Sequence, residues 1–466
     1  MKLVLVGGGG FRVPQVVEAV GAADAAVRVD EVHLHDVSPA RLAVVRSVLE
    51  QLAQRLPHPP RISAGTDLDE ALRGADFVFS AMRIGGTAGR VLDERVALDL
   101  GVLGQETVGP GGLAYALRTL PHARHLAERV RAVAPDAWVI SFTNPAGIVT
   151  EAMRAVLGER VVGICDTPIG LVRRAARAVG ATSEGVTFDY AGLNHLGWLR
   201  SLQVDGRERL PDLLADDEAL DGIEEARTLG VDWVRTVGAL PNEYLYYYSY
   251  PREATERLRA AAQTRGQFLD AQQGDFYARA AAHPERALET WESVHRAREA
   301  SYMAESRPEP TSVSAAGAPV GGGSAAEGAG AGDRRAEDLE GGGYQRVALD
   351  LMAALVTGRT ATMILDVAND GVLPCLPDEA VVEVPCTVDA EGVHPHAVAP
   401  LTGDMLGLVQ QVKASEQLLL EASATRSREL AWRAFAAHPL VDSVAVARLL
   451  LDGYREALPE VGRALD

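Results

Sequence analysis

The first 160 residues alternate short apolar runs with stretches of helical periodicity, and this alternation constrains the fold more than any other feature of the sequence. The apolar runs read KLVLVG, EVHLHD, ADFVFSA and AWVISFTNP. Amphipathic stretches that start at Pro14 and Pro39 separate the first three runs. Strands that alternate with helices in this way predict a parallel, doubly wound sheet, so we expect an α/β fold.

Glycine and polar residues fall at the carboxyl ends of these predicted strands. Ligands of a doubly wound sheet bind outside the carboxyl ends of its strands. We therefore expect one ligand site built from segments that lie far apart in the sequence. The residues concerned are Gly7, Gly8, Gly9 and Gly10 after the first run, Asp36, the segment from Met82 to Arg90, and Asn144.

The glycine run predicts a loop whose backbone amides face a pyrophosphate at a helix N-terminus. It departs from G-x-G-x-x-G, because Arg12 replaces the third glycine when the motif is read from Gly7, and Val13 replaces it when read from Gly8. Asp36 ends the second predicted strand, where a carboxylate accepts hydrogen bonds from ribose hydroxyls and favours NAD over NADP. The alternatives are a tight turn without a ligand and a solvated aspartate.

A length of 466 residues predicts two domains. We expect a nucleotide-binding domain over residues 1–160 and a helix-rich domain of mixed α and β type over residues 161–466. Extended segments in the second domain are expected at GVTFDYAGLNHLGWL, TATMILDVAND and AVVEVPCTV. Between residues 306 and 343 the composition changes to mostly Ala, Gly, Ser, Pro and Glu, which predicts a flexible insertion.

Composition excludes several classes of partner. The net charge of −19 disfavours nucleic acid and anionic membranes, because both carry negative charge. No apolar stretch approaches the roughly 18 residues of a membrane-spanning helix. The N-terminal apolar run leads into glycines rather than a cleavage site, so we interpret it as a strand and expect a cytoplasmic protein. Three cysteines without zinc-ribbon spacing are typical of a reducing compartment.

Cys165 in VVGICDTP and His195 in AGLNHLGW each stand at the polar end of an apolar run. A thiolate and an imidazole brought together would hold one divalent cation and leave positions open for substrate oxygens. From the residue chemistry alone the alternative is the commoner case: a buried cysteine acts as a small hydrophobe, and a core histidine is often only hydrogen-bonded. The soft thiolate by itself favours zinc or iron.

Further candidates stand in polar or aromatic segments. The cluster PNEYLYYYSYP is either an aromatic wall or a source of one catalytic base, since a metal lowers the pKa of a nearby phenol. An extended segment would group Tyr244 with Tyr246 and Tyr248, whereas a helix would group it with Tyr247 and Tyr248. Asn144 precedes a proline and also fits a turn. Glu106, which stands between glycines in GQETVGPGG, is equally consistent with a surface loop. Arg265 in QTRGQF is equally consistent with a solvated helix residue.

Taken in order, seven segments resemble the sequence blocks of glycoside hydrolase family 4. They are VGGGGFRVP, GQETVGPGGLAYALR, SFTNPAG, GICDTPIG, YAGLNHLGW, PNEYLYYY and VVEVPCTV. The resemblance implies a Rossmann domain followed by an α+β domain like the C-terminal domain of lactate and malate dehydrogenases. It also implies NAD and a divalent metal, commonly manganese, as cofactors, and the metal ligands correspond to Cys165 and His195.

The resemblance further implies a reaction that needs a dinucleotide. Hydride transfer from C3 of the sugar to NAD acidifies the C2 proton; its removal allows the C1 substituent to be eliminated, and water addition and hydride return follow. By the same resemblance Tyr244 is the base, and Asn144 and Asn194 contact the sugar. Arg90 and Arg265 would bind a 6-phosphate. The partner is then a phosphorylated disaccharide or glucoside, and we expect a dimer or tetramer of identical chains.

Asp166 departs from the β-specific pattern, in which many members carry Asn after the metal cysteine. 6-Phospho-α-glucosidases carry Asp there, with a proposed role in leaving-group departure. Three other segments, YAGLNHL, NEYLYYY and GGGYQRVALDLMAAL, look more like the 6-phospho-β-glucosidase branch, which we therefore expect. The alternatives are a 6-phospho-α-glucosidase, α-galactosidase or α-glucuronidase of the same family, a 2-hydroxy-acid dehydrogenase, and a catalytically silent sensor.

Overall fold

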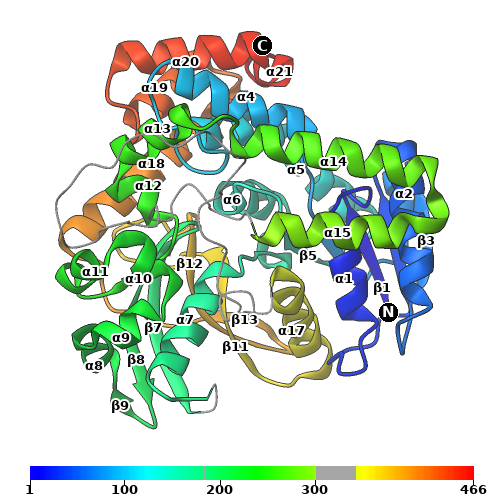
Figure 1. Cartoon of the computed structure of the whole chain (residues 1–466), viewed down its shortest axis with the longest axis horizontal. Coiled ribbons are helices and arrows are strands. Elements are labelled where there is room, and N and C mark those ends of the chain that lie inside the picture. Colours follow the sequence, from blue (N-terminus) through cyan, green and yellow to red (C-terminus); the bar gives the residue numbers. More distant parts are fainter. Residues whose placement is uncertain (183–184, 301–342) are drawn as a thin grey trace, which may run out of the picture.

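The structure is a computed structural model that describes residues 1–182, 185–300 and 343–466 (Figure 1). Its strands form one sheet with helices on both faces (Figure 1). None of the helices in these ranges is long and apolar enough to cross a lipid bilayer. The insertion predicted at residues 306–343 lies outside the described residues except for Gly343.

Parallel strands form the N-terminal part of the sheet in the order β3-β2-β1-β4-β5-β6. The chain builds outward from β1 to β3, returns, and builds outward again from β4 on the other side of β1. This is the strand order of a Rossmann fold and confirms the predicted doubly wound sheet. The bounds are β1 Lys2–Val6, β2 Glu31–His35, β3 Arg61–Gly65, β4 Phe77–Ser80, β5 Trp138–Ser141 and β6 Val161–Gly163.

Beyond β6 the same sheet continues in antiparallel fashion. Gly163 of β6 pairs with Asp366 of β11, β11 pairs with β12, and Gly192 of β7 pairs with Glu383 of β12. The predicted domain boundary at residue 160 falls just before the strand that joins the two halves, and it stays a prediction. The bounds are β7 Val186–Leu193, β8 Leu196–Val204, β9 Arg207–Glu208, β10 Leu240–Pro241, β11 Ala361–Ala368, β12 Val381–Asp389 and β13 Gly392–Pro395.

Alternate residues of β1 face two separate cores, as expected for a parallel strand covered on both sides. Leu3 and Leu5 pack with α1, α2 and α17, whereas Val4 and Val6 pack with α5, α6 and the C-terminal helices. The first face carries α1 Val13–Val20, α2 Pro39–Ala53 and α17 Tyr344–Thr357. The second carries α5 Gly109–Val133, α6 Ala146–Leu157, α18 Gly403–Thr425, α19 Arg428–Ala437, α20 Val444–Ala457 and α21 Pro459–Leu465.

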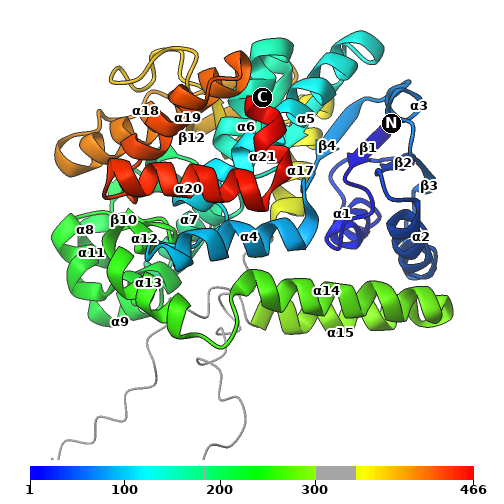
Figure 2. The ribbon, with the colours of Figure 1, turned by 90° about the horizontal axis from the view of Figure 1, so that it is seen from above.

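The remaining helices border the sheet or extend beyond it. Beside β7 and β8 stand α7 Thr167–Ala178, α8 Leu210–Ala215, α9 Asp217–Asp221, α10 Glu224–Leu229 and α11 Val231–Val237 (Figure 1). The next helix, α12 Leu245–Ser249, leads to α13 Pro251–Ala260, which contacts α4. The others are α3 Leu68–Leu72, α4 Gly86–Asp99, α14 Arg265–Ala282 and α15 Ala287–Ala300. Figure 2 shows α14 and α15 as an antiparallel pair that runs past α4 towards α2. A capping box of Thr264 and Gln267 fixes the start of α14.

The helix pair α14 and α15 holds the glycine loop that follows β1. Tyr277 donates a hydrogen bond to the backbone oxygen of Gly9 at 2.7 Å, and Trp291 donates one to that of Phe11 at 2.8 Å. The Phe11 ring stands edge-on to Phe276, with 5.2 Å between ring centroids. These contacts bring residues 265–300 over the carboxyl end of β1, where a ligand of the Rossmann sheet would bind.

A fully buried ion pair joins α4 to α5 beneath the same edge. Asp93 and Arg118 have side chains with no exposed surface and form two parallel hydrogen bonds, with Nη2 and Oδ2 2.6 Å apart. Arg118 also donates to the backbone oxygen of Ile84, which fixes the loop after β4. Removing one partner would leave the other charge buried without compensation.

We therefore expect Asp93→Asn to lower the free energy of unfolding by about 3–5 kcal/mol, the usual cost of breaking a buried pair. The matched control is Asp69→Asn, because Asp69 also binds an arginine, Arg129, through two hydrogen bonds but at a partly exposed site. It should cost less than about 1 kcal/mol. Urea unfolding of both variants measures the difference, and equal costs would contradict the expectation.

Candidate active site

A cavity of about 330 Å³ lies at the carboxyl ends of β1, β4, β5 and β6. Its volume is within the range of small-molecule sites. Most residues selected from the sequence line it, although they come from segments spread over 260 residues of chain. These lining residues are Gly7, Gly10, Arg90, Asn144, Cys165, Asp166, Asn194, His195, Tyr244 and Arg265.

Gly8, Gly9 and Asp36 do not line the cavity, but they shape the loop beside it. The Asp36 carboxylate accepts hydrogen bonds from the amides of Gly9 at 3.1 Å and Ser38 at 2.9 Å. At Gly7, φ is +89° and a Cβ would stand 2.5 Å from the backbone oxygen of Ala81. A side chain there would separate β1 from the loop after β4, so glycine is required.

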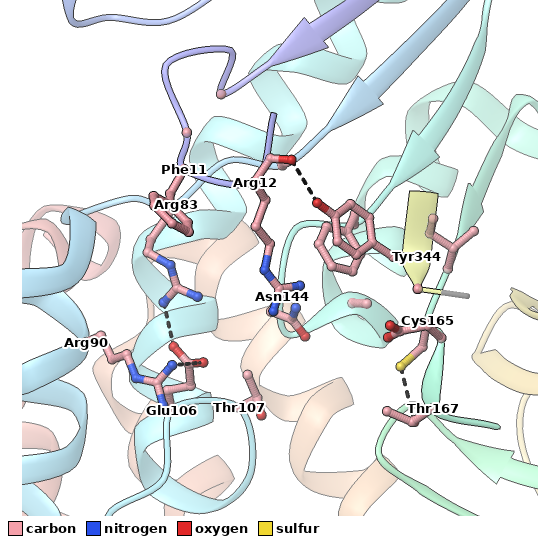
Figure 3. A pocket seen from close by; sticks show the side chains of 18 of the residues that line it. Phe11, Arg12, Arg83, Arg90, Glu106, Thr107, Asn144, Cys165, Thr167 and Tyr344 are labelled. Carbon is pink, nitrogen blue, oxygen red and sulfur yellow. Dashed lines mark hydrogen bonds and ion pairs between the residues drawn. The ribbon is translucent and has the colours of Figure 1, made fainter. Parts of the chain in front are cut away.

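Arg12 stands directly before α1 and projects into the cavity beside Asn144 (Figure 3). Its guanidinium carbon lies 5.6 Å from the ring centroid of Phe142 and 5.2 Å from that of Tyr344. These two rings are stacked 4.2 Å apart, and the Tyr344 hydroxyl donates to the backbone oxygen of Arg12 at 2.9 Å. The residue that interrupts the glycine motif is therefore a cation held over an aromatic pair.

Cys165 and His195 line the same cavity from opposite halves of the sheet. Cys165 follows β6, and its Sγ lies 3.3 Å from Oγ1 of Thr167. His195 lies in the tight turn between β7 and β8 with φ of +64°. Burial lowers the pKa of His195 to about 3, which keeps the imidazole in the neutral form that binds metals. Burial and the nearby Glu383 and Asp166 carboxylates raise the pKa of the Cys165 thiol.

Within the described ranges, no group of three or more His, Cys, Asp and Glu side chains is arranged to hold a metal ion. Cys165 and His195, the ligands predicted from the sequence, would offer a cation two positions. The remaining coordination positions would have to come from substrate oxygens or water, as in catalytic sites that keep open positions.

Tyr244 stands at the start of α12 and stacks on His195, with ring centroids 3.7 Å apart and planes 8° from parallel. The segment is helical, so the helical grouping of the tyrosines is the one that occurs. The Asn242 side chain accepts a hydrogen bond from the Tyr244 amide at 3.0 Å and donates one to Oγ1 of Thr167 at 2.8 Å. This link connects the tyrosine segment to the cysteine segment.

Arg83, Arg90 and Glu106 form an ion cluster at one wall of the cavity, in which Arg90 and Glu106 are buried and Arg83 is partly exposed (Figure 3). Each arginine binds one oxygen of the Glu106 carboxylate, and Arg90 also binds Glu94 at 2.8 Å. Burial alone would raise the pKa of Glu106, but the two guanidinium charges outweigh it and hold the pKa at about 2. Glu106 is therefore an anion that orients two arginines and is unsuited to donate a proton near neutral pH.

Among the described residues, seven arginines line the cavity: Arg12, Arg41, Arg83, Arg90, Arg174, Arg265 and Arg298. Burial and the like charges of Arg12, Arg265 and Arg90 lower the pKa of Arg298 well below its ordinary value. Such crowding of cations favours an anionic ligand, because an anion relieves their mutual repulsion. The family resemblance implied such a role for Arg90 and Arg265. Arg83 lies within the segment from Met82 to Arg90 that was expected at the site, whereas Arg298 lies in a charge-rich helix with no distinguishing signal.

Two asparagine side chains bring amide oxygens to the site. Oδ1 of Asn144 and Oδ1 of Asn194 are both buried and have no hydrogen-bond partner among the described residues. Asn194 donates through Nδ2 to Glu383 at 3.2 Å. Glu383 was not selected from the sequence, although a carboxylate within the apolar run VVEVP is a signal, since burying a charge is costly unless it is compensated.

Comparison with known proteins covers the chain almost end to end. The model of the Family 4 glycosyl hydrolase matches residues 2–181, and the model of the Family 4 glycosyl hydrolase C-terminal domain matches residues 190–441. A probable 6-phospho-β-glucosidase of Bacillus subtilis is 29% identical over 98% of this chain and 96% of its own length. A maltose-6′-phosphate glucosidase of the same organism is 28% identical over 100% and 97%.

Solved structures with the same fold include proteins with bound cofactors. The 6-phospho-β-glucosidase of Thermotoga maritima with manganese, NAD⁺ and glucose 6-phosphate has a TM-score of 0.78 at 26% identity, covering 99% of both chains. A 6-phospho-α-glucosidase from gut microorganisms with NAD and Mn²⁺ has a TM-score of 0.76 at 26% identity, covering 98% of this chain and 97% of its own.

The ion cluster around Glu106 should make the free energy of unfolding depend on pH in acid. Because the folded-state pKa lies at about 2, below the ordinary 4.5, the stabilisation from ionised Glu106 is complete above pH 4.5 and is lost as the pH falls through 2. The difference corresponds to about 3 kcal/mol. We expect Glu106→Gln to be less stable than the wild type at neutral pH, with the gap closing by roughly this amount towards pH 2. Urea unfolding across this range measures it, and a constant gap would contradict the assignment.

Proposed function

The chain belongs to glycosyl hydrolase family 4, and from that premise we propose that it is a 6-phospho-β-glucosidase that uses NAD and a divalent metal. Its substrates would be β-glucosides phosphorylated at the 6-position, such as phosphorylated cellobiose, and its product glucose 6-phosphate. One observation carries the proposal: the cavity that begins at the glycine loop also contains Cys165, His195 and Tyr244 and is lined by arginines.

The residues present fit both cofactors. The loop of residues 7–10, braced by Asp36, would hold the dinucleotide at the start of α1. Neutral His195 and Cys165 would hold the metal, and the substrate's hydroxyl oxygens would complete a set suited to manganese rather than to zinc. When bound, NAD would accept and return a hydride at C3 of the sugar, and the metal would act as a Lewis acid there.

The chain's own side chains would then bind the sugar and move its protons. We assign the removal of the C2 proton to Tyr244, which His195 holds at the site by ring stacking. Asp166, which lines the cavity beside Cys165, would assist departure of the C1 substituent. Asn144 and Asn194 would orient sugar hydroxyls. Arg90 and Arg265 would bind the 6-phosphate, with Arg83 and Arg298 adding positive charge.

Preference for the β-anomer is the finer part of the proposal. It is supported by the similarity of residues 190–196 and 242–248 to the β-specific branch, whereas Asp166 favours the α-specific branch. Turnover of p-nitrophenyl β- and α-glucoside 6-phosphates, with NAD and Mn²⁺, decides between them. The unphosphorylated glucosides test the role of the arginines. Net accumulation of NADH during turnover would instead indicate a 2-hydroxy-acid dehydrogenase.

We also infer a cytoplasmic location, because phosphorylated sugars and NAD are intracellular metabolites and the three cysteines are free thiols. The dimer or tetramer expected from the family resemblance stays a prediction. Sedimentation velocity at micromolar concentration measures the assembly state directly.

We expect Cys165→Ser and His195→Ala each to abolish turnover at ordinary metal concentration. Losing a ligand should weaken Mn²⁺ binding by more than about 100-fold, since even partners that only orient a ligand are worth 10- to 100-fold. Titration calorimetry with Mn²⁺ measures the affinity apart from turnover. Cys386→Ser is a matched control, because Cys386 is a buried thiol that does not line the cavity. Full activity of the wild type after chelation would exclude the metal's role.

We expect Tyr244→Phe to lower kcat by about 10²- to 10⁴-fold with KM little changed, because the ring that stacks on His195 remains and only the proton acceptor is lost. Tyr246→Phe is the control, since Tyr246 lies one residue into the same helix but does not line the cavity.

Turnover in D₂O tests the reaction course independently of any variant. Proton removal and return at C2 must place deuterium at C2 of the released glucose 6-phosphate, which proton NMR detects. Direct displacement at C1 leaves C2 untouched, so a product without deuterium at C2 would refute the redox-elimination course.

A further inference from the structure

Glu383 is the third residue of β12 and lies behind the cavity, with 1% of its surface exposed. Its neighbour across the ladder in β7 is Gly192, which has no side chain to compete for the space. Both carboxylate oxygens are engaged: Oε1 accepts from Nδ2 of Asn194 at 3.2 Å, and Oε2 accepts from the Tyr190 hydroxyl at 3.0 Å. The two donors belong to β7 and to the turn that carries His195.

The contact with Glu383 determines which end of the Asn194 amide faces the cavity. An amide has one donor end and one acceptor end. Burial raises the pKa of Glu383 to about 7, and above that pH its ionised carboxylate can only accept, as it does from Nδ2 of Asn194 at 3.2 Å. Nδ2 must therefore point to Glu383, and Oδ1 takes the opposite position. Oδ1 is buried, has no hydrogen-bond partner among the described residues, and belongs to a side chain that lines the cavity. A free amide in this position would have no such preference.

We propose that Glu383 is a positioning residue that fixes the Asn194 amide with its oxygen towards the sugar, so that the site selects a sugar carrying a hydroxyl donor at the carbon beside Asn194. This inference rests on the proposed function, because it assumes that a sugar phosphate occupies the cavity. A buried acceptor left without a partner is costly, so an analogue with hydrogen in place of that hydroxyl should bind less tightly.

Glu383 also has a structural role that must be separated from this one. It is the hydrogen-bond acceptor for Tyr190, a fully buried side chain, and it lies opposite Asp366 of β11. Tyr190→Phe removes this second contact and leaves the contact with Asn194 intact. It is therefore the matched control: it should lower stability without changing how the site distinguishes sugars.

The test is direct binding, by titration calorimetry, of glucose 6-phosphate and its 2-deoxy, 3-deoxy and 4-deoxy analogues to the protein loaded with NAD and Mn²⁺. The wild type should bind glucose 6-phosphate about 10-fold more tightly than one of the analogues, as expected for one hydrogen bond. Glu383→Leu and Asn194→Ala should each lose this preference. The double variant should have the same ratio of affinities for the two sugars as Asn194→Ala alone, because Glu383 acts through Asn194.

Glu383→Gln is the second variant, to be used if Glu383→Leu does not fold. Glutamine can present either its donor or its acceptor to Asn194, so the amide loses its fixed direction while the buried hydrogen bonds remain. The preference should then fall several-fold. An unchanged preference in a folded Glu383 variant, or loss of the preference in Tyr190→Phe, would overturn the inference. Failure of the wild type to bind glucose 6-phosphate at all would instead refute the proposed function.

Discussion

The candidate site depends on how β6 joins the two halves of the sheet. On one side β6 pairs in parallel with β5, and on the other it meets the antiparallel strand β11 through the pair Gly163 and Asp366. Because β11, β12 and β7 follow in the same sheet, the turn that carries His195 comes to face the end of β6, where Cys165 lies. Gly163 is essential at this join, since a Cβ there would stand 2.7 Å from the Cβ of Asp366.

The cavity is lined by positive charge, whereas the chain as a whole is negatively charged. The chain carries a net charge of −19, yet seven arginines of the described residues line the cavity. Their repulsion is partly relieved by carboxylates that are themselves buried, Glu94 and Glu106. A phosphate group would add a further negative charge beside these arginines, which a neutral sugar would not. The arrangement therefore favours an anionic ligand over a neutral one.

The sequence predicted those features that repeat locally and missed those that arise from pairing across the sheet. Alternating strands and helices predicted the doubly wound sheet, because burial on both faces imposes that pattern on every strand. For the tyrosine segment both periodicities fitted, and the structure shows a helix that begins after Tyr244, whose ring stacks on His195. Pairing Cys165 with His195 needed the family resemblance, since the two lie in separate segments. Glu383 and Arg298 meet the site only through tertiary contacts.

Short-range contacts couple the residues proposed to hold the metal to the proposed base, and these contacts limit how the site can vary. Asn242 binds the Tyr244 amide through its oxygen and Thr167 through its nitrogen, and Thr167 in turn contacts the sulfur of Cys165. His195 in turn stacks on the Tyr244 ring. A shift of the tyrosine would therefore move both groups proposed to hold the metal. Asp166 is less constrained, because it stands before α7 without a side-chain cap hydrogen bond. A site of this kind can therefore accept a change of leaving-group geometry more easily at Asp166 than at Tyr244. For this reason the anomeric preference and the proposed proton transfer by Tyr244 can be tested separately.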